Sequence, residues 1–575
     1  MHDLAFRPYA AVVALSLLCC ALFLPGIATL PVTDRDEARF AQASKQMVET
    51  GDTIDIRLQD KPRYKKPAGI YWLQAAAVTV ATRAGAALND IWAYRIPSFL
   101  GALGAVLLTF WAGRAILGRE AALIASALFA TTLMLSFEAR IAKADAALIA
   151  SITLSQAALF RLYEAPAKAA TRGLATLFWF GLGAGILIKG PVALGLALLT
   201  SVVALAADAR RGWLKNLHWR WGVPLLLLVT LPWLIAIGIA SNGDFFTQSV
   251  TQDFAGKLQA AQEKHWGPPG FYGLAFLWTF WPAALFVTAD TIRALWKMRR
   301  SRRIIFLFAW IVPFWLILEA IPTKLPHYAL PLYPAIAMVA AFAMRSEKPP
   351  QIRVSAIIWG LVAATQITLL LCMSWIAEAP QLTLLAAICA IFAATAALTV
   401  IAAWRSYRSL ALFGIILSGA VFYGAGYRIA LPALEPFWIS EKASAAAHAL
   451  EGCGRGPAGF AGLNEISVVF QNGTDTLLTA PGTLADALAT NQVRVAFVSW
   501  KNEHEFEQAF SQRAGHGPEF FGCVDGIDIN GQGPVRLQVY VRPEAANAPG
   551  CAPTPAMACR PKDAVRWRRL LDTKF

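Results

Sequence analysis

The sequence predicts a polytopic α-helical membrane protein, with about 13 transmembrane helices followed by a small α/β domain. Of the 575 residues, 57% are hydrophobic and only 15% are charged, whereas about a quarter of the residues in a soluble domain are charged. Apolar runs of about 20 residues, long enough to cross a bilayer, recur up to residue 431. We therefore expect residues 1–431 to form a transmembrane domain and residues 432–575 to form a C-terminal domain outside the membrane.

From residue 96 onward, Lys and Arg gather in every second gap between the apolar runs and greatly outnumber Asp and Glu there. These gaps lie at residues 114–119, 161–172, 210–220, 293–303, 345–353 and 405–408. Cytoplasmic loops carry such an excess of basic residues, so we assign the gaps to the cytoplasm. This assignment gives a cytoplasmic N-terminus and a periplasmic C-terminal domain. It also accounts for the net charge of +15 without nucleic acid as a partner.

The opening of the chain follows from the same alternation. We interpret residues 9–30 as a first membrane helix rather than a signal peptide, because many spanning runs follow. The shorter apolar stretch at residues 69–81 cannot also cross, since every later basic gap would then lie outside. We expect it to lie along the membrane interface, where Tyr71 and Trp72 suit the headgroup region. Residues 31–95 then form one long periplasmic loop.

This first loop holds many ionisable side chains for so apolar a chain, and Asp36 and Lys66 are its leading functional candidates. Charged groups at membrane depth are costly to bury and are therefore candidates for function. Other ionisable or polar side chains are predicted at the same face: Glu138, Arg140, Lys143, Asp145, Lys189, Asp244, Asp253, Lys257, Lys264, His265, Lys324, His327 and Tyr328. Structural interpretations stay open, because a carboxylate can cap a helix and a lysine can extend toward headgroups.

The C-terminal domain is predicted to contain strands at residues 465–470, 493–500 and 536–541, with a short helix at residues 503–513. Its four cysteines allow three pairings, and an oxidising periplasm favours disulfides. We expect Cys453 to pair with Cys523 and Cys551 with Cys559. Zinc is the weaker alternative, since the spacing contains no CxxC pair.

Three motifs resemble those of the bacterial aminoarabinose transferases and the related protein O-mannosyltransferases. They are DEARF with a following GD, KKP before an aromatic patch, and ILIKGP at residues 186–191. Their order and their common predicted face make the set more specific than any one motif. The resemblance covers the whole membrane portion. It implies a membrane glycosyltransferase of the GT-C class, which takes a sugar from a polyprenyl (undecaprenyl) phosphate.

The resemblance also implies roles for individual residues. Its two loop aspartates fall on Asp36 and Asp145, which become the catalytic candidates. The implied donor-phosphate ligands are Lys66, Lys189, Arg39 and Lys65. Further candidates are Glu37, Tyr64, Lys324, His327 and Tyr328.

The chain departs from the aminoarabinose transferases at two places. Those enzymes have an aromatic residue and a glutamate before the loop lysine, where this chain has Tyr64 and Lys65, and they have tyrosine where it has Phe40. The missing glutamate weakens a metal site with His265, so we assign no metal and leave a divalent cation open as a cofactor. It also weakens aminoarabinose as the sugar.

The chemistry of such a transfer matches the residue types. A phosphate leaving group needs positive charge where its negative charge develops, and a hydroxyl acceptor needs a base such as Asp36. We expect one sugar to pass to lipid A or lipopolysaccharide at the periplasmic face of a bacterial inner membrane. A protein acceptor and a lipid or solute transporter are the alternatives. Internal repeats, which a transporter would be expected to have, are not visible in the sequence.

Overall fold

The computed structural model of the chain describes residues 8–166, 170–249, 266–345, 352–530 and 533–561. Within these ranges, nine segments are long and apolar enough to cross a membrane. They are α5 (Ile91–Ile116), α8 (Asp145–Glu164), α9 (Arg172–Lys189), α11 (Trp219–Ala240), α16 (Arg302–Ala320), Pro326–Arg345, α18 (Arg353–Ile376), α19 (Leu382–Trp404) and Arg408–Ala430. The segment Pro326–Arg345 comprises η4 (Pro326–Leu332) and α17 (Tyr333–Arg345), and the last comprises α20 (Arg408–Ala425) and η5 (Gly426–Ala430). The chain is therefore a multi-pass membrane protein.

Shorter helices complete the helical part. Apolar ones are α2 (Pro8–Phe23) and α10 (Val192–Ala207). The others are α6 (Arg119–Ala130), α7 (Leu133–Glu138), η1 (Gly212–Leu217), α12 (Asp244–Phe246), α14 (Phe271–Thr279), η3 (Ala283–Phe286) and α15 (Ala289–Lys297). The total of about 13 spans stays a prediction, because helices of this length need not cross a bilayer of ~30 Å.

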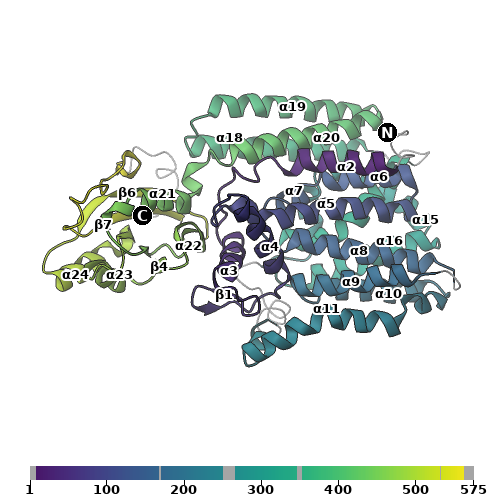
Figure 1. The fold of residues 1–575 in the computed structure, drawn as a ribbon. Helices are drawn as coiled ribbons and strands as arrows, with labels where there is room; N and C mark the ends of the chain where they lie inside the picture. Colours follow the sequence, from purple (N-terminus) through teal and green to yellow (C-terminus); the bar gives the residue numbers. More distant parts are fainter. Residues whose placement is uncertain (1–7, 167–169, 250–265, 346–351, 531–532, 562–575) are drawn as a thin grey trace.

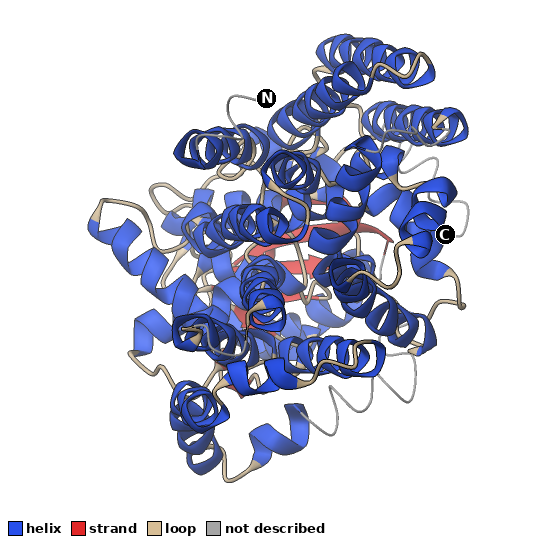
Figure 2. Cartoon of the chain, turned by 90° about the vertical axis from the view of Figure 1, so that its right-hand side faces the viewer, coloured by secondary structure: helices blue, strands red, loops and turns tan. Residues whose placement is uncertain are grey.

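The spanning helices lie side by side, and Figure 2 views them nearly end-on with the sheet of the C-terminal domain behind them. Two spans are mostly enclosed by protein: α8 and Pro326–Arg345 are each 83% buried, against 17% for α11 and 22% for α18. The last two are therefore the least enclosed of these spans. The enclosed pair carries Asp145, His327 and Tyr328, so these residues lie within the bundle rather than at its rim.

The first loop folds over one end of the bundle. It contains α3 (Asp36–Thr50), the short strands β1 (Arg57–Leu58) and β2 (Lys61–Pro62), and α4 (Gly69–Arg83). Gly51 ends α3 in the left-handed conformation (φ 75°), with its N–H bonded to Met47 O, as is common at helix C-termini. In Figure 1, α3 and α4 lie between the membrane helices and the C-terminal domain, whereas the N-terminus lies at the far end of the bundle.

The C-terminal domain has a five-stranded sheet in the order β4-β3-β5-β7-β6. Its strands are β3 (Ala458–Ala461), β4 (Leu477–Leu478), β5 (Val495–Ser499), β6 (Glu519–Asp528) and β7 (Gly533–Val541). Strand β3 runs parallel to β4 and β5, whereas β7 is antiparallel to β5 and β6. Its helices are η6 (Glu435–Phe437), α21 (Ile439–Ala449), η7 (Glu451–Cys453), α22 (Ile466–Asn472), α23 (Pro481–Ala489), η8 (Trp500–Asn502), α24 (Glu503–Ala514) and η9 (Pro555–Met557).

Predictions for this domain were right for β5, β7 and α24 but wrong for residues 465–470, which form helix α22 instead of a strand. Val468 and Val469 of this helix pack into the core of the C-terminal domain. Phe470 instead packs with the first loop and Tyr94, at a ring distance of 5.2 Å. As a helix, this segment packs against the core of the C-terminal domain on one side and against the first loop on the other. This packing overrides the strand preference of its β-branched residues.

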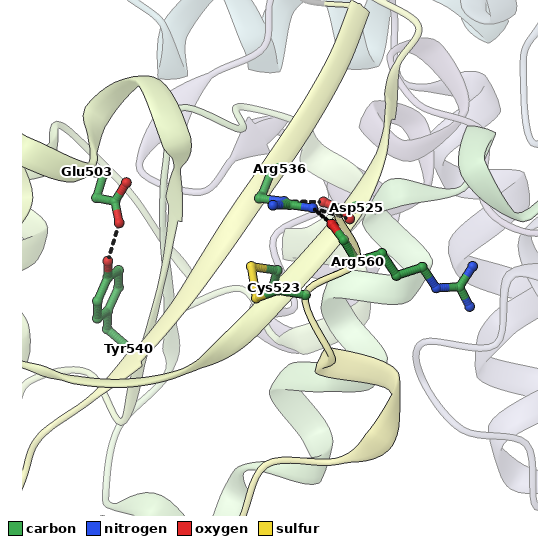
Figure 3. Close-up of a disulfide and its surroundings, with 7 residues drawn as sticks. Glu503, Cys523, Asp525, Arg536, Tyr540 and Arg560 are labelled. Atoms are coloured by element: carbon green, nitrogen blue, oxygen red, sulfur yellow. Dashed lines mark hydrogen bonds and ion pairs between the residues drawn. A yellow bond between two sulfur atoms is a disulfide. The ribbon is translucent and has the colours of Figure 1, made fainter. Parts of the chain in front are cut away.

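The disulfide pairing also differs from the prediction. Cys453 pairs with Cys551, and Cys523 pairs with Cys559. The chain after β7 returns past η7, so that Gly550 lies directly against Gly452, and this approach brings Cys551 to Cys453 rather than to Cys559. The second bridge ties the C-terminal segment to β6, close to the bidentate ion pair of Arg536 with Asp525 (2.8 and 2.9 Å) (Figure 3).

Candidate active site

A cavity of about 410 Å³ opens where the first loop covers the ends of the membrane helices. Its wall combines the start of α3, the loop before α4, the turn between α7 and α8, the end of α9 and the start of η4. The lining residues are Thr33, Asp34, Arg35, Asp36, Glu37, Arg39, Phe40, Arg63, Lys65, Lys66, Phe137, Ile141, Lys143, Ala144, Asp145, Lys189, Thr323, Leu325, His327 and Tyr328. Seven of these are Lys or Arg and four are Asp or Glu. A cavity with this balance favours an anionic ligand.

Asp36 is the first residue of α3 and is exposed toward this cavity. The residue before it, Arg35, has φ 65°, so the chain turns sharply before the helix begins. A carboxylate at a helix N-terminus is stabilised by the helix dipole. Asp36 therefore presents its carboxyl group to a cavity that seven Lys and Arg side chains also line.

Glu37 has a different role from its neighbour, because it is fully buried. Its carboxylate accepts hydrogen bonds from Arg95 at 2.8 and 3.0 Å, and from the backbone N–H groups of Thr33 and Ala142 at 2.9 Å each. Burial raises the pKa of Glu37, but Arg95 and these hydrogen bonds outweigh it and leave the pKa below the ordinary value. This carboxylate therefore fixes the first loop and the turn before α8 in place.

Asp145 is the first residue of α8 and forms an ion pair with Lys189, the last residue of α9, at 2.5 Å. Nε2 of His327 lies 3.9 Å from the same carboxylate oxygen. The Lys189 ammonium also lies 5.7 Å from the centre of the Tyr328 ring. Three separate helices thus meet at Asp145.

Lys143 also reaches the cavity wall, and its ammonium lies 3.2 Å from Oε1 of the fully buried Glu138. Burial lowers the pKa of Lys143, but Glu138, Asp145 and Asp36 outweigh it and raise the pKa above the ordinary value. Lys143 is therefore a fixed cation within the field of both candidate aspartates.

The family described as dolichyl-phosphate-mannose-protein mannosyltransferase matches residues 71–242. Undecaprenyl phosphate-alpha-4-amino-4-deoxy-L-arabinose arabinosyl transferases from Shewanella sediminis and Pseudomonas aeruginosa are each 25% identical, over 57% and 54% of this chain. The alignments span 59% and 55% of those relatives, which is less than two thirds of their length.

A crystal structure of ArnT from Cupriavidus metallidurans bound to undecaprenyl phosphate superposes with a TM-score of 0.72 at 18% identity. The match covers 94% of this chain and 98% of that one. The chain has the ArnT fold. Because the match extends over nearly the whole length, the ArnT-like fold includes the C-terminal domain as well as the membrane helices.

In this ArnT-like chain, most of the side chains singled out by sequence line one cavity. They are Asp36, Glu37, Arg39, Lys65, Lys66, Asp145, Lys189, His327 and Tyr328. Arg63 and Lys143 also line the cavity, and neither was predicted as a ligand. Lys143 stands two residues before Asp145, and this proximity was the available signal.

Two candidates lie outside the cavity lining. Tyr64 is buried and donates a hydrogen bond to Asp55 at 2.9 Å; burial and this carboxylate raise its pKa to about 12. Lys324 is also buried and donates to the carbonyls of Leu318 and Glu319, each at 2.7 Å. Tyr64 is therefore bonded to a side chain of the first loop, and Lys324 to the backbone at the end of α16.

The predicted weak metal ligand His265 lies outside the described residues. Among those that the structure describes, no group of three or more His, Cys, Asp or Glu is placed to hold a metal ion.

Proposed function

We propose that the chain is a membrane glycosyltransferase that moves one sugar from a polyprenyl (undecaprenyl) phosphate to an envelope acceptor, with lipid A or lipopolysaccharide as the first choice. The observation that carries this proposal is the cavity with seven Lys and Arg at the end of the helical bundle. A lipid phosphate presents its anion at this depth while its chain stays among apolar helices. The ArnT fold supports the same function, since the matched structure holds undecaprenyl phosphate.

The proposed reaction is a displacement with inversion at the anomeric carbon of the sugar. An acceptor oxygen forms the new bond, the bond to the donor phosphate oxygen breaks, and polyprenyl phosphate leaves with the electron pair. Lys66, Lys189, Arg39 and Lys65 stabilise the charge on this phosphate, because preorganised cations in a water-poor site act strongly on developing charge. Arg39 adds a forked donor, whereas the lysines act as point charges.

Asp36 acts on the acceptor side of this reaction. With a hydroxyl acceptor, the carboxylate takes the hydroxyl proton as the oxygen attacks. Such general-base catalysis raises the rate roughly 10²–10⁴-fold. A phosphate acceptor is already anionic, and Asp36 then stabilises positive charge on the anomeric carbon instead. Asp145 holds Lys189 toward the donor through their 2.5 Å contact.

The description of the matched family supports a protein as the second candidate acceptor. A protein hydroxyl would use Asp36 as the base described above. The identity of the acceptor therefore also decides whether a proton passes to Asp36.

We further propose an inner-membrane location, with the N-terminus in the cytoplasm and the C-terminal domain in the periplasm. The two disulfides of the C-terminal domain support this orientation, because disulfides persist in oxidising compartments. The basic gaps between the later spans support it from the cytoplasmic side.

The test is mass spectrometry of envelope lipids and glycoproteins from cells with the wild-type protein, without it, and with Asp36→Asn. We expect a mass increment of one sugar that disappears in the deletion strain and falls at least ~100-fold with Asp36→Asn. The variant should insert and fold like the wild type, because Asp36 is exposed. Full modification by Asp36→Asn would overturn the site assignment, and unchanged masses in every fraction of the deletion strain would overturn the transferase.

A further inference from the structure

The C-terminal domain holds the residue two positions before Asp36. The hydroxyl of Ser440, on α21, donates a hydrogen bond to Oδ1 of Asp34 at 3.0 Å. The hydroxyl of Ser467, on α22, donates to the same oxygen. Two helices of this domain therefore converge on one carboxylate at the cavity wall.

The next residue, Arg35, is held by the same domain. Its Nη2 donates a hydrogen bond to the backbone oxygen of Asn530 at 3.0 Å. Asn530 is itself fixed, because its side-chain amide donates to Glu465 at 2.8 Å and its backbone N–H donates to Asp528 at 2.9 Å. Arg35 adopts φ 65° and ψ −106°, a conformation that is costly for a residue with a Cβ and persists only where its surroundings enforce it.

Further along α3, two more side chains form hydrogen bonds to the C-terminal domain. Lys45 donates to the carbonyl of Phe470 at 2.9 Å, and Gln42 donates to the hydroxyl of Thr474 at 2.8 Å. The C-terminal domain lies directly beside α3 in Figure 1. The helix that begins with Asp36 is thus held at its start and along its length by a domain that is distant in sequence.

We propose that the C-terminal domain is a working part of the site, in which Ser440, Ser467 and Asn530 act as positioning residues that fix Asp36 over the cavity. This inference rests on the proposed function. A turn with the backbone angles of Arg35 relaxes when its partners are removed, and Asp36 moves with it. Ser440 and Ser467 line no part of the cavity, so they act on the rate only through the position of Asp36. A misplacement of about 1 Å at a reacting group costs roughly 10²-fold in rate.

The experiment compares transfer kinetics of the full chain in lipid nanodiscs for the wild type, Ser440→Ala/Ser467→Ala and Ser511→Ala. The control serine lies exposed on α24. For the double variant we expect kcat to fall roughly 10–100-fold, with donor KM within about twofold and an unchanged pull-down on immobilised undecaprenyl phosphate. Ser511→Ala should behave like the wild type. Unchanged kcat in the double variant would overturn the proposal.

A second pair of variants separates positioning from folding. Asp34→Asn keeps an oxygen that accepts hydrogen bonds from both serines, whereas Asp34→Ala does not. We therefore expect a lower kcat in the alanine variant than in the asparagine variant, and the same thermal midpoint in both. Equal kcat in these two variants would also overturn the proposal. Absence of transfer by the wild-type protein to any acceptor would instead overturn the proposed function, which keeps the two failures distinct.

Discussion

Asp145 and Lys189 form an ion pair in the cavity wall, with side chains only 8% and 15% exposed. Removing one member of such a pair leaves an uncompensated charge, which costs about 3–5 kcal/mol. Replacing both members removes the charges together. The stability of this site and its ability to bind phosphate can therefore be separated by a pair of substitutions.

We predict that Lys189→Met destabilises the protein and abolishes polyprenyl phosphate binding, whereas Asp145→Asn/Lys189→Met recovers stability without recovering binding. Thermal unfolding in detergent and capture on immobilised undecaprenyl phosphate measure the two effects. Recovery of binding in the double variant would show that Lys189 serves Asp145 rather than the donor.

Sequence reasoning placed Asp36, Lys66, Asp145 and Lys189 on one face, because alternation of basic gaps fixes which loops lie together. It could not tell which charges are neutralised inside the protein. Glu37 stood beside Asp36 as a further candidate, yet its carboxylate is paired with Arg95 at 2.8 Å. That contact joins residues 58 positions apart, and no local pattern in the sequence indicates it.

Among the elements, spanning helices were predictable because each must bury its backbone polar groups within one apolar run. Strand β5 was predictable because it is a mostly apolar run, VAFVS, and β7 because apolar and polar residues alternate in VRLQVYV. Strand β3 is a four-residue segment, AGFA, whose small residues carry little strand preference. Helix α22 could not be predicted, since its two-sided burial depends on a domain contact that only the folded chain contains.

The two disulfides offer an element-level prediction. Cys453–Cys551 spans 98 residues and Cys523–Cys559 spans 36. Loop-closure entropy assigns about 4.7 and about 3.8 kcal/mol to crosslinks of these lengths. We predict that Cys453→Ser/Cys551→Ser lowers the stability of the domain by about 1 kcal/mol more than Cys523→Ser/Cys559→Ser.

Denaturant-dependent hydrogen exchange of β5 and β7 in the full chain measures this difference. The bidentate pair of Arg536 with Asp525 should persist in both variants, because it joins β6 to β7 directly (Figure 3). A larger loss on removing the Cys523 bridge would mean that native-state packing around that bridge, rather than loop length, dominates its contribution.

At the scale of the whole molecule, the first loop and the C-terminal domain lie at the same end of the bundle (Figure 1). Positive-inside reasoning predicted this shared end from charge alone. It did not predict their contact. The alternation of basic gaps assigns each loop to a side of the membrane but gives no distance between loops on that side. The contact nevertheless connects the start of α3 in the candidate active site with the C-terminal domain.

Asp34 makes this contact sensitive to pH. Burial and then Glu465 raise its pKa from 3.8 to about 7, although Ser467 and Ser440 act in the opposite direction. The carboxylate of Asp528 also raises the pKa of Asp34. A hydrogen bond from the backbone of Arg35 and the charge of Arg39 act on Glu465 and lower its pKa. We call Asp34 docked when Ser440 and Ser467 contact it, and undocked when these contacts are absent. The docked state therefore favours a protonated Asp34, whereas Asp34 in the undocked state titrates near ~3.9.

The sign of the effect follows from these two values. Below pH ~4 Asp34 is neutral in both states and exerts no pH dependence. As the pH rises toward about 7, the undocked form gains charge freely while the docked form resists it, so docking weakens progressively. Above that pH the full penalty applies.

We predict that Asp34→Asn removes this penalty, so that its thermal midpoint exceeds that of the wild type at pH 8 and approaches it at pH 5. Asp60→Asn, an exposed acid of the same loop, provides the control and should keep the wild-type slope. Glu465→Gln should reduce the wild-type slope without abolishing it, because burial is the larger cause of the shift. Identical slopes for Asp34→Asn and the wild type would show that Asp34 is charged in the docked state, and its two serine hydroxyls would then act as donors to an anion.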